Sequence, residues 1–208
     1  EDLELRVEER TRELAEANRL LKQSYDDTIR AITAAMDAKD SYTRGHSEEV
    51  KRIALKIGQK MSLPPESLRR LEYAALLHDI GKIGVSEQLL TKGTALTEFE
   101  FEEVKLHPQI GGKLLEQVEL LKETGPIIHA HHENFDGSGY PKGLKGEAIP
   151  IESRIIAVAD AYEAMTMDRP YRKALSQGEA RQRLKQGAGT QFDPRIVEVL
   201  LEMEGITQ

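Results

Sequence analysis

The 208-residue sequence predicts an all-α fold, namely a helical bundle preceded by one long helix and interrupted by one long glycine-rich loop. Apolar residues recur at helical spacing in one segment after another, and no segment shows the period-two alternation of a half-buried strand. Pro65, Pro108 and Pro194 each suit the first turn of a helix, and Asp193 before Pro194 is a good N-cap.

The first expected element is a helix over residues 1–35. This segment contains no glycine or proline, and Val7, Leu14 and Leu21 follow one another at seven-residue spacing. Two arrangements are consistent with the pattern: a parallel coiled coil that makes the protein a homodimer, or a helix that folds back on its own domain. Because the first residue is not methionine, we interpret the chain as a fragment in which this helix links the domain at 36–208 to a missing sensor or receiver domain.

Eight further helices are expected within 36–208. They cover residues 47–61, 65–77, 98–105, 108–121, 125–132, 151–167, 178–187 and 193–204. Residues 133–150 break the pattern, because they hold four glycines and two prolines. A structureless connection of this length inside a compact domain is usually functional, so we expect this loop to form a wall or lid of the site.

Composition excludes several classes of protein. Without cysteine the chain has no disulfide, no thiolate ligand and no cysteine nucleophile. A net charge of -7 argues against binding to DNA, which requires a basic face. No apolar run approaches the length of a membrane span, and no signal segment opens the chain. We therefore expect a cytoplasmic protein, unless a missing upstream region tethers it to a membrane.

Several acidic and histidine side chains lie in apolar sequence, where burial is costly. Asp160 falls within the run Ile-Ile-Ala-Val-Ala-Asp-Ala, and His78 with Asp79 ends another apolar stretch. An unpaired carboxylate in such a place must be protonated or compensated, and a cation compensates it. His131 and His132 are adjacent, and two imidazoles that repel when protonated gain from a shared metal.

His46 and His107 are weaker candidates on their own, since each stands at the start of a helix. Taken together, the residues predict a metal site whose ligands are His46, His78, Asp79, His107, His131, His132 and Asp160. His129, one turn before the double histidine, is interpreted as an ordinary helix residue. Imidazole and carboxylate ligands without thiolate favour Fe, Mn, Ni, Co or Zn over Ca or Mg.

Two motifs carry a family resemblance. His-Asp-Ile-Gly-Lys at 78–82 is followed by His-His-Glu-Asn-Phe-Asp-Gly-Ser-Gly-Tyr-Pro at 131–141. Together they closely resemble the signatures of the HD-GYP domain, the bacterial cyclic di-GMP phosphodiesterases of the HD superfamily, over about residues 25–205. The resemblance implies an HD-type helical bundle that hydrolyses cyclic di-GMP to linear pGpG, or onward to GMP, as the output domain of a signalling protein.

The resemblance also implies two divalent metal ions, Fe or Mn first, with Ni, Co or Zn as alternatives. Asp79 would bridge the ions, with His46, His78 and Asp160 completing one site and His107, His131 and His132 the other. A hydroxide shared by the metals would attack phosphorus. Tyr42 stands where family members with a third metal have a glutamate, so two ions are expected rather than three.

Five residues are expected at the substrate. Lys82 would contact the scissile phosphate or assist the leaving oxygen, which makes it a catalytic candidate beside Asp79. Arg169 and Arg172 suit bidentate recognition of phosphate. Tyr140 would stack on the dinucleotide or form a hydrogen bond with it. Glu163, where the family more often has aspartate, is the last substrate-binding candidate.

Two loop residues are given supporting roles. Asp136 is expected to order the glycine-rich loop, and Glu133 to support a ligating imidazole. Two other functions fit the same sequence. One is a sensory module that binds cyclic di-GMP without hydrolysing it, and the other is an enzyme that acts on mixed cyclic GMP-AMP or another phosphoester.

Overall fold

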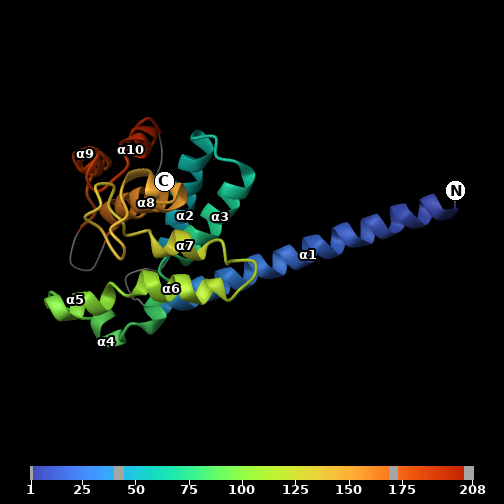
Figure 1. Ribbon diagram of the computed structural model, residues 1–208, viewed down its shortest axis with the longest axis horizontal. Helices are drawn as coiled ribbons and strands as arrows, with labels where there is room; N and C mark the ends of the chain where they lie inside the picture. The colour runs from blue at the N-terminus through green and yellow to red at the C-terminus, as the bar shows by residue number, and fades with distance from the viewer. Residues whose placement is uncertain (1, 40–44, 169–172, 204–208) are drawn as a thin grey trace. The chain divides into compact units, whose positions relative to one another are not determined.

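The computed structural model describes residues 2–39, 45–168 and 173–203, and within them the chain is all-α with no strand (Figure 1). The predicted fold class is therefore confirmed. The chain divides into two compact units, Glu1–Ile32 and Thr33–Gln208. Among the described residues no helix has both the length and the apolar composition needed to cross a bilayer.

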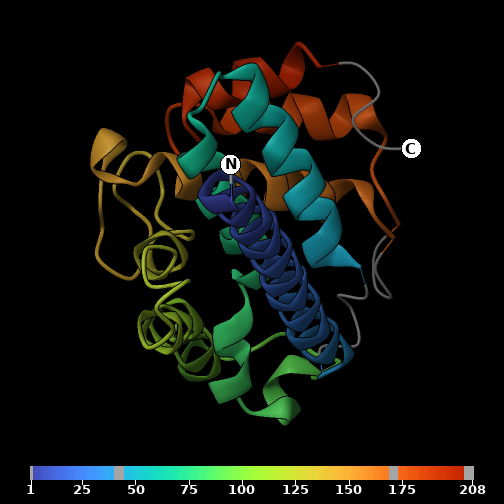
Figure 2. The ribbon, with the colours of Figure 1, turned by 90° about the vertical axis from the view of Figure 1, so that its right-hand side faces the viewer.

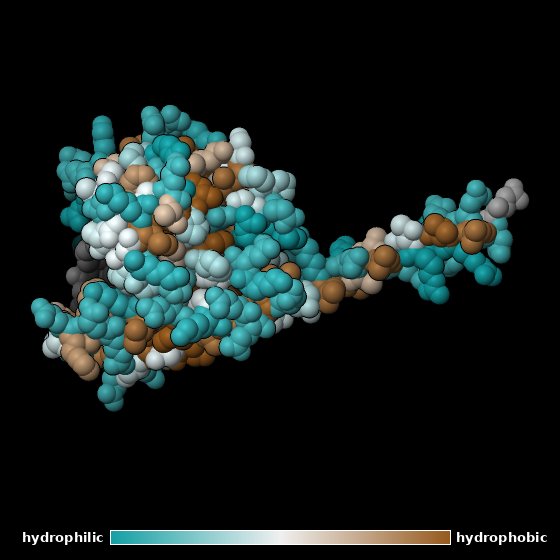
Figure 3. All heavy atoms as spheres, in the orientation of Figure 1, coloured by the Kyte–Doolittle hydropathy of each residue, from teal (hydrophilic) through white to brown (hydrophobic). Residues whose placement is uncertain are grey.

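The first unit consists of helix α1, which spans Asp2–Lys39 and continues into the second unit. The helix is present as expected and extends four residues beyond the expected end. Large apolar side chains recur along it and are more than half exposed: Leu3, Leu5, Val7, Leu14, Leu20 and Leu21. Figure 3 shows brown apolar spheres among teal polar ones along this helix. The coiled-coil dimer and the folded-back helix both stay predictions.

Three helices form the centre of the second unit: α2 (His46–Lys60), α3 (Pro65–Leu77) and α8 (Ile151–Thr166). Val50, Ile53, Ala54 and Ile57 are fully buried on α2, and their spacing of three and four residues places them on one face. The facing positions of α3 and α8 are fully buried as well: Leu71, Ala74, Ala75, Ile155, Ile156, Val158, Ala159 and Tyr162.

Shorter elements surround this centre. They are η1 (Ile80–Gly84), α4 (Glu87–Leu90), α5 (Glu98–Val104), α6 (His107–Glu116), α7 (Gly125–His129), η2 (Gly146–Ala148), α9 (Gln177–Gly187) and α10 (Pro194–Leu201). Figures 1 and 2 both show α9 and α10 at one end of this unit, beside α8, and the green helices α4 and α5 at the other end.

Three expectations about helix bounds were wrong. The helix expected over 108–121 ends at Glu116, the one expected over 125–132 ends at His129, and the one expected over 193–204 ends at Leu201. Beyond Glu116 the chain tightens into turns in which an amide bonds the carbonyl three residues earlier, as from Val118 to Leu115. The pieces η1 and α4 were not expected, because elements of four or five residues are too short to show a helical period.

The glycine-rich segment 133–150 contains only η2 and otherwise follows an irregular path, as expected. Backbone hydrogen bonds fix it to the turn before α10. The amide of Phe135 donates to the carbonyl of Gln191 at 3.2 Å, and that of Asp136 to the carbonyl of Thr190 at 2.9 Å. The loop is therefore held by hydrogen bonds within its own turns and by hydrogen bonds to a segment more than fifty residues later in the sequence.

Candidate metal centre

The structure brings all seven predicted ligands together. Six of them stand at helix ends, and the seventh, Asp160, lies within α8. His46 and His107 begin α2 and α6, His78 and Asp79 follow α3, and His131 and His132 follow α7. His46, His78, His107 and His131 are buried. Helix ends can deliver side chains to one point from several directions, which is what a metal site requires.

The first cluster joins α2, α3 and α8. The Nε2 atom of His46 lies 3.4 Å from Nε2 of His78 and 3.3 Å from Oδ1 of Asp160. Oδ2 of Asp79 lies 3.6 Å from Nε2 of His78. His46, His78 and Asp79 are close enough to share one ion, and Asp160 falls in a second such group with His46 and Glu163.

The second cluster joins α6 and the turn after α7. Nε2 of His107 lies 3.4 Å from Nε2 of His131 and 3.2 Å from Nε2 of His132. It also lies 3.4 Å from Oδ1 of Asp79. The two oxygens of Asp79 therefore face different clusters, which is the position of a bridging carboxylate.

The distances within each cluster fit a shared cation better than hydrogen bonds. Two ligand nitrogens about 2.1 Å from one ion in tetrahedral geometry lie about 3.4 Å apart. Without a proton between them, two imidazoles that direct their Nε2 lone pairs at each other repel, and a cation removes that repulsion. The nitrogen and oxygen donor set is one that Fe, Mn, Co, Ni and Zn accept. The seven residues could thus hold two transition-metal ions that share Asp79.

Backbone carbonyls orient three of the imidazoles. In each, Nδ1 donates to the carbonyl three residues earlier: His78 to Ala75 at 2.8 Å, His107 to Val104 at 2.8 Å and His131 to Ile128 at 2.6 Å. A carbonyl only accepts hydrogen bonds, so Nδ1 must carry the proton, and Nε2 keeps the lone pair that binds metal.

His46 is oriented by a side chain instead. Its Nδ1 lies 2.7 Å from Oε2 of Glu163, which is 4% exposed. Glu163 was expected at the substrate, and this stays a prediction; in the structure its carboxylate faces the ring nitrogen that points away from the cluster. One helical turn along α8 separates it from Asp160, so the two acids reach opposite nitrogens of the same ring.

The pKa values of His132, His131 and Asp79 favour the protonation states that bind a metal ion. Burial and the neighbouring His107 lower the pKa of His132 to about 4, and burial with the neighbouring His132 holds the pKa of His131 well below its usual range. Burial alone would raise the pKa of Asp79, but Lys82 and His78 outweigh it and keep that pKa well below 3.8. These three groups are therefore already in their metal-binding protonation states at neutral pH.

His46 differs from the other imidazoles. Burial alone would lower its pKa, but the hydrogen bond to Glu163 and the charge of Asp160 outweigh burial and raise the pKa to about 9. A cation at Nε2 must displace that proton, so occupation of the first cluster releases a proton that the second does not.

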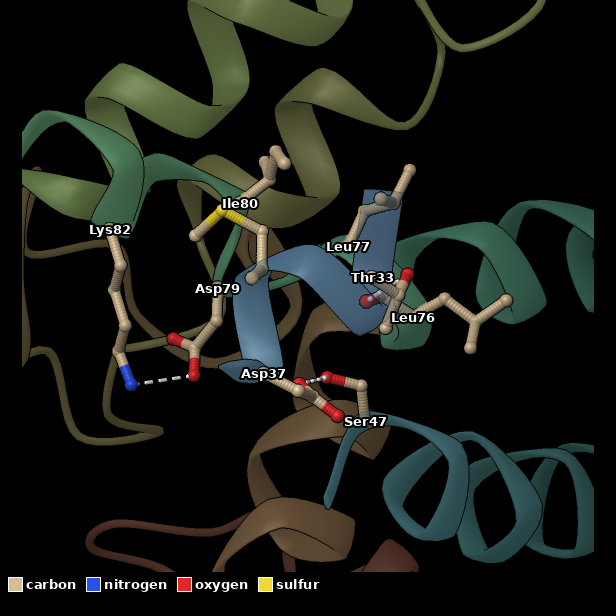
Figure 4. Close-up of a pocket in the computed structure, with 9 residues that line it drawn as sticks. Thr33, Asp37, Ser47, Leu76, Leu77, Asp79, Ile80 and Lys82 are labelled. Carbon is tan, nitrogen blue, oxygen red and sulfur yellow. Dashed lines mark hydrogen bonds and ion pairs between the residues drawn. The ribbon is translucent and has the colours of Figure 1, made fainter. Parts of the chain in front are cut away.

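Lys82 lies beside the shared carboxylate. Its ammonium is 2.7 Å from Oδ2 of Asp79, and Figure 4 shows the two side chains facing each other at one end of a small pocket. The pair places a cation next to the point where both clusters meet.

The same pocket shows how the end of α1 contacts both ligand-bearing helices (Figure 4). Asp37 accepts hydrogen bonds from the amide of Gly45 at 3.1 Å and the hydroxyl of Ser47 at 3.2 Å, on either side of His46. Thr33 donates from Oγ1 to the carbonyl of Leu76 at 3.3 Å, two residues before His78. Sequence reasoning missed Thr33 and Asp37, because nothing local to them signals the contact.

The glycine-rich loop walls a cavity of about 460 Å³ that also contains His131, His132 and Asp160. The ring of Tyr140 stacks on His132, with centroids 4.9 Å apart and an angle of 25°. Burial, with the charge of Asp79, raises the pKa of Tyr140 to about 12, so the phenol keeps its proton. The loop therefore lines the site as a wall.

Two loop carboxylates were assigned roles from the sequence. Asp136 accepts from the amide and hydroxyl of Ser138, which agrees with the expected ordering of the loop. Glu133 was expected to support an imidazole, and this was wrong. Its carboxylate accepts from the amides of Lys142 at 2.7 Å and Leu144 at 3.0 Å, so it closes the loop instead.

Three predicted residues, Arg169, Arg172 and Tyr42, lie outside the described residues. The phosphate contacts of the two arginines and the limit of two ions therefore stay predictions.

The comparisons with known proteins bear on this centre directly. The family model described as HD domain matches residues 30–196, which is most of the chain and includes every ligand candidate. The chain belongs to the HD domain family. The resemblance to HD-GYP domains expected from the two motifs is confirmed, since curated relatives named as cyclic di-GMP phosphodiesterases match across the same region.

Three relatives of this HD domain illustrate the match. A cyclic di-GMP phosphodiesterase response regulator of Xanthomonas campestris is 40% identical over 84% of this chain and 47% of its own length. A cyclic di-GMP phosphodiesterase of Thermotoga maritima is 36% identical over 86% and 49%. A 3'3'-cGAMP-specific phosphodiesterase of Vibrio cholerae is 36% identical over 89% and 41%. The chain thus spans about half the length of these relatives.

Solved structures confirm the HD fold. A cyclic GMP-AMP-specific phosphodiesterase of Vibrio cholerae superposes with a TM-score of 0.67 at 22% identity, over 84% of this chain and 47% of that one. An HDG"Y"P protein of Bdellovibrio bacteriovorus superposes with a TM-score of 0.62 at 19% identity, over 86% and 62%. At these identities the likeness concerns the fold.

Proposed function

We propose that this HD domain is a metal-dependent phosphodiesterase that opens cyclic di-GMP to linear pGpG. The observation that carries the proposal is the position of Asp79, whose two oxygens face two separate histidine clusters at 3.4 and 3.6 Å. Relatives named as cyclic di-GMP phosphodiesterases support the choice of substrate. When bound, two adjacent divalent cations neutralise phosphate oxygens and make water a nucleophile at neutral pH.

The side chains divide the work of such a reaction. His46, His78, Asp79 and Asp160 would hold one ion, and Asp79, His107, His131 and His132 the other. Lys82 sits against Asp79 at 2.7 Å, so its ammonium would lie beside a phosphate oxygen or the leaving oxygen at the metal ligands. Tyr140 presents a protonated phenol to the cavity and can donate to the dinucleotide.

Turnover with defined metals tests the proposal. The protein is purified without oxygen, loaded with Fe(II) or Mn(II) and incubated with cyclic di-GMP, and the products are separated by chromatography. We expect pGpG as the first product. His132→Ala should abolish turnover, whereas His129→Ala, three residues earlier and outside the clusters, should retain it. Absence of product with every first-row metal would defeat the proposal.

A second substrate is favoured by a specific observation. Relatives named as 3'3'-cGAMP-specific phosphodiesterases match this chain at up to 38% identity, comparable with the cyclic di-GMP enzymes. Competition between equal concentrations of the two cyclic dinucleotides gives the ratio of kcat/KM directly. A ratio above ten in favour of mixed cyclic GMP-AMP would replace cyclic di-GMP in the proposal.

A single-turnover experiment on the same protein distinguishes the phosphodiesterase from a sensory module that only binds cyclic di-GMP. The sensory module requires metal-dependent binding of cyclic di-GMP with no product in a single turnover. We further propose that residues 1–35 join the domain to a sensor or receiver and dimerise as a coiled coil. Sedimentation of the chain with and without residues 1–24 should show a dimer becoming a monomer, and an unchanged mass would contradict the dimer.

A further inference from the structure

One wall of the cavity at the metal centre comes from α5 and was not assigned any role by the motifs. Phe101 and Lys105, near the end of this helix, line the same cavity of about 460 Å³ as His132 and Asp160. They stand outside both signature motifs, so the family resemblance gives no account of them.

These two side chains continue a row that starts at the metal ligands. The ring of His132 stacks on Tyr140, and the ammonium of Lys105 lies 5.6 Å from the centroid of the Tyr140 ring. The same ammonium lies 4.9 Å from the centroid of Phe101. The groups along the wall are therefore, in order, the imidazole of His132, the phenol of Tyr140, the ammonium of Lys105 and the phenyl ring of Phe101.

Phe101 is available to a ligand. It is 46% exposed although it lines a cavity, and an aromatic face in that state is the platform on which nucleobases stack. Phe99, two residues earlier, is 83% exposed and does not belong to the cavity lining. The helix thus offers two exposed phenylalanines, of which one borders the site.

Lys105 supplies charge at the same place. Its ammonium is 2.6 Å from Oε1 of Glu102, and the side chain remains 28% exposed. An ammonium carries three donors, so two remain for an anion after Glu102 takes one. In a chain of net charge -7, a cation held between two aromatic rings beside the metal centre favours an anionic, aromatic ligand.

We propose that Phe101 and Lys105 form a subsite for the half of a cyclic dinucleotide that is not cut. Phe101 stacks on a purine base, and Lys105 binds the second phosphodiester while the first lies at the metal ligands. The proposal deepens the proposed function and rests on it. It explains how the domain would distinguish a cyclic dinucleotide from a simple phosphodiester, which has no second phosphate and no second base.

Paired substrates and a paired control test the subsite. Cleavage of cyclic di-GMP and of bis(p-nitrophenyl) phosphate is measured for the wild type, Phe101→Ala and Phe99→Ala at equal metal content. Loss of one stacking platform is worth about 5- to 100-fold in affinity. We expect KM for cyclic di-GMP to rise by that factor in Phe101→Ala only, with bis(p-nitrophenyl) phosphate unaffected. Lys105→Gln should behave likewise, and Lys105→Arg should restore most of the loss.

Calorimetry gives the Kd of cyclic di-GMP for the same metal-loaded proteins, and this tests the subsite without requiring turnover. A Kd raised in Phe101→Ala and unchanged in Phe99→Ala supports it, even if the wild type cleaves nothing and the proposed activity fails. Equal affinities in the two variants overturn the subsite. So does an equal loss on both phosphodiester substrates, which would indicate a displaced metal centre.

Discussion

Gly81 occupies a position in η1 where no side chain fits. A Cβ atom built there would lie 1.8 Å from the carbonyl oxygen of His107 and 2.6 Å from the amide nitrogen of Gly111. Both atoms belong to the backbone of α6, so no rotamer change can relieve the contact. Gly81→Ala must therefore push η1 and α6 apart.

The size of the effect follows from these distances. Real Cβ atoms stay at least 3.0 Å from such neighbours, so the His107 carbonyl must recede from 1.8 Å to beyond that limit. Overpacking typically costs about 1–3 kcal/mol, and a backbone obstacle places this substitution at the upper end, about 3 kcal/mol. For a domain of this size that corresponds to a Tm lower by about 6–12 °C.

Function should fail together with stability, because η1 begins directly after Asp79 and α6 begins at His107. Moving the two elements apart lengthens the 3.4 Å separation between Nε2 of His107 and Oδ1 of Asp79. We expect Gly81→Ala to retain less metal after dialysis against a chelator. Calorimetry gives the Tm, and elemental analysis gives the metal content.

The same short helix provides the control. A Cβ at Gly84 would meet the tip of the Ile110 side chain at 2.9 Å, which can rotate away. Gly84→Ala should cost less than about 1 kcal/mol and keep its metal. If Gly81→Ala melts within about 2 °C of the wild type and holds the same metal, the argument from close backbone approach is wrong.

Three further predictions concern carboxylates. Asp37→Ala removes the acceptor that fixes the residues on either side of His46, so metal affinity should fall about 10- to 100-fold in a chelator titration. Glu133→Gln leaves one loop amide without its acceptor, and limited proteolysis should cut residues 137–146 faster than in the wild type. Asp193, buried against Arg154 at 2.6 Å, has its pKa lowered because hydrogen bonds from Arg195 and Arg154 outweigh burial. The contribution of this carboxylate to stability is present above the ordinary pKa of 3.8 and is lost as pH falls through the lowered pKa. Asp193→Asn should therefore be less stable than the wild type at pH 7, and urea titrations should show the difference closing in acid.

The fold class could be predicted because its evidence is local. The spacing of Val50, Ile53, Ala54 and Ile57 defines a buried helical face without knowledge of any partner. Burial cost identified Asp79 and Asp160 in the same way, since each carboxylate stands in an apolar run. Both kinds of evidence depend only on neighbouring residues in the sequence, so they hold whatever the arrangement of the helices.

The contacts that the sequence could not predict join distant segments. Glu163 lies one turn from Asp160 and faces the far nitrogen of His46, which depends on how α8 meets α2. Glu133 bonds amides nine and eleven residues ahead, a closure set by the path of the loop. The proposed role of Phe101 depends on the position of α5 in the same cavity lining as Tyr140, which no sequence periodicity predicts.

The three imidazoles held by backbone carbonyls have an evolutionary consequence. Every amino acid supplies the same carbonyl oxygen, so residues 75, 104 and 128 can be exchanged without changing which ring nitrogen of His78, His107 and His131 binds metal. The path of the backbone, and not the identity of the side chains at these positions, determines the tautomer of each imidazole. Substitutions at these three positions that fit the fully buried sites of Ala75 and Ile128 should therefore leave the metal centre intact so long as the turns that end the helices persist.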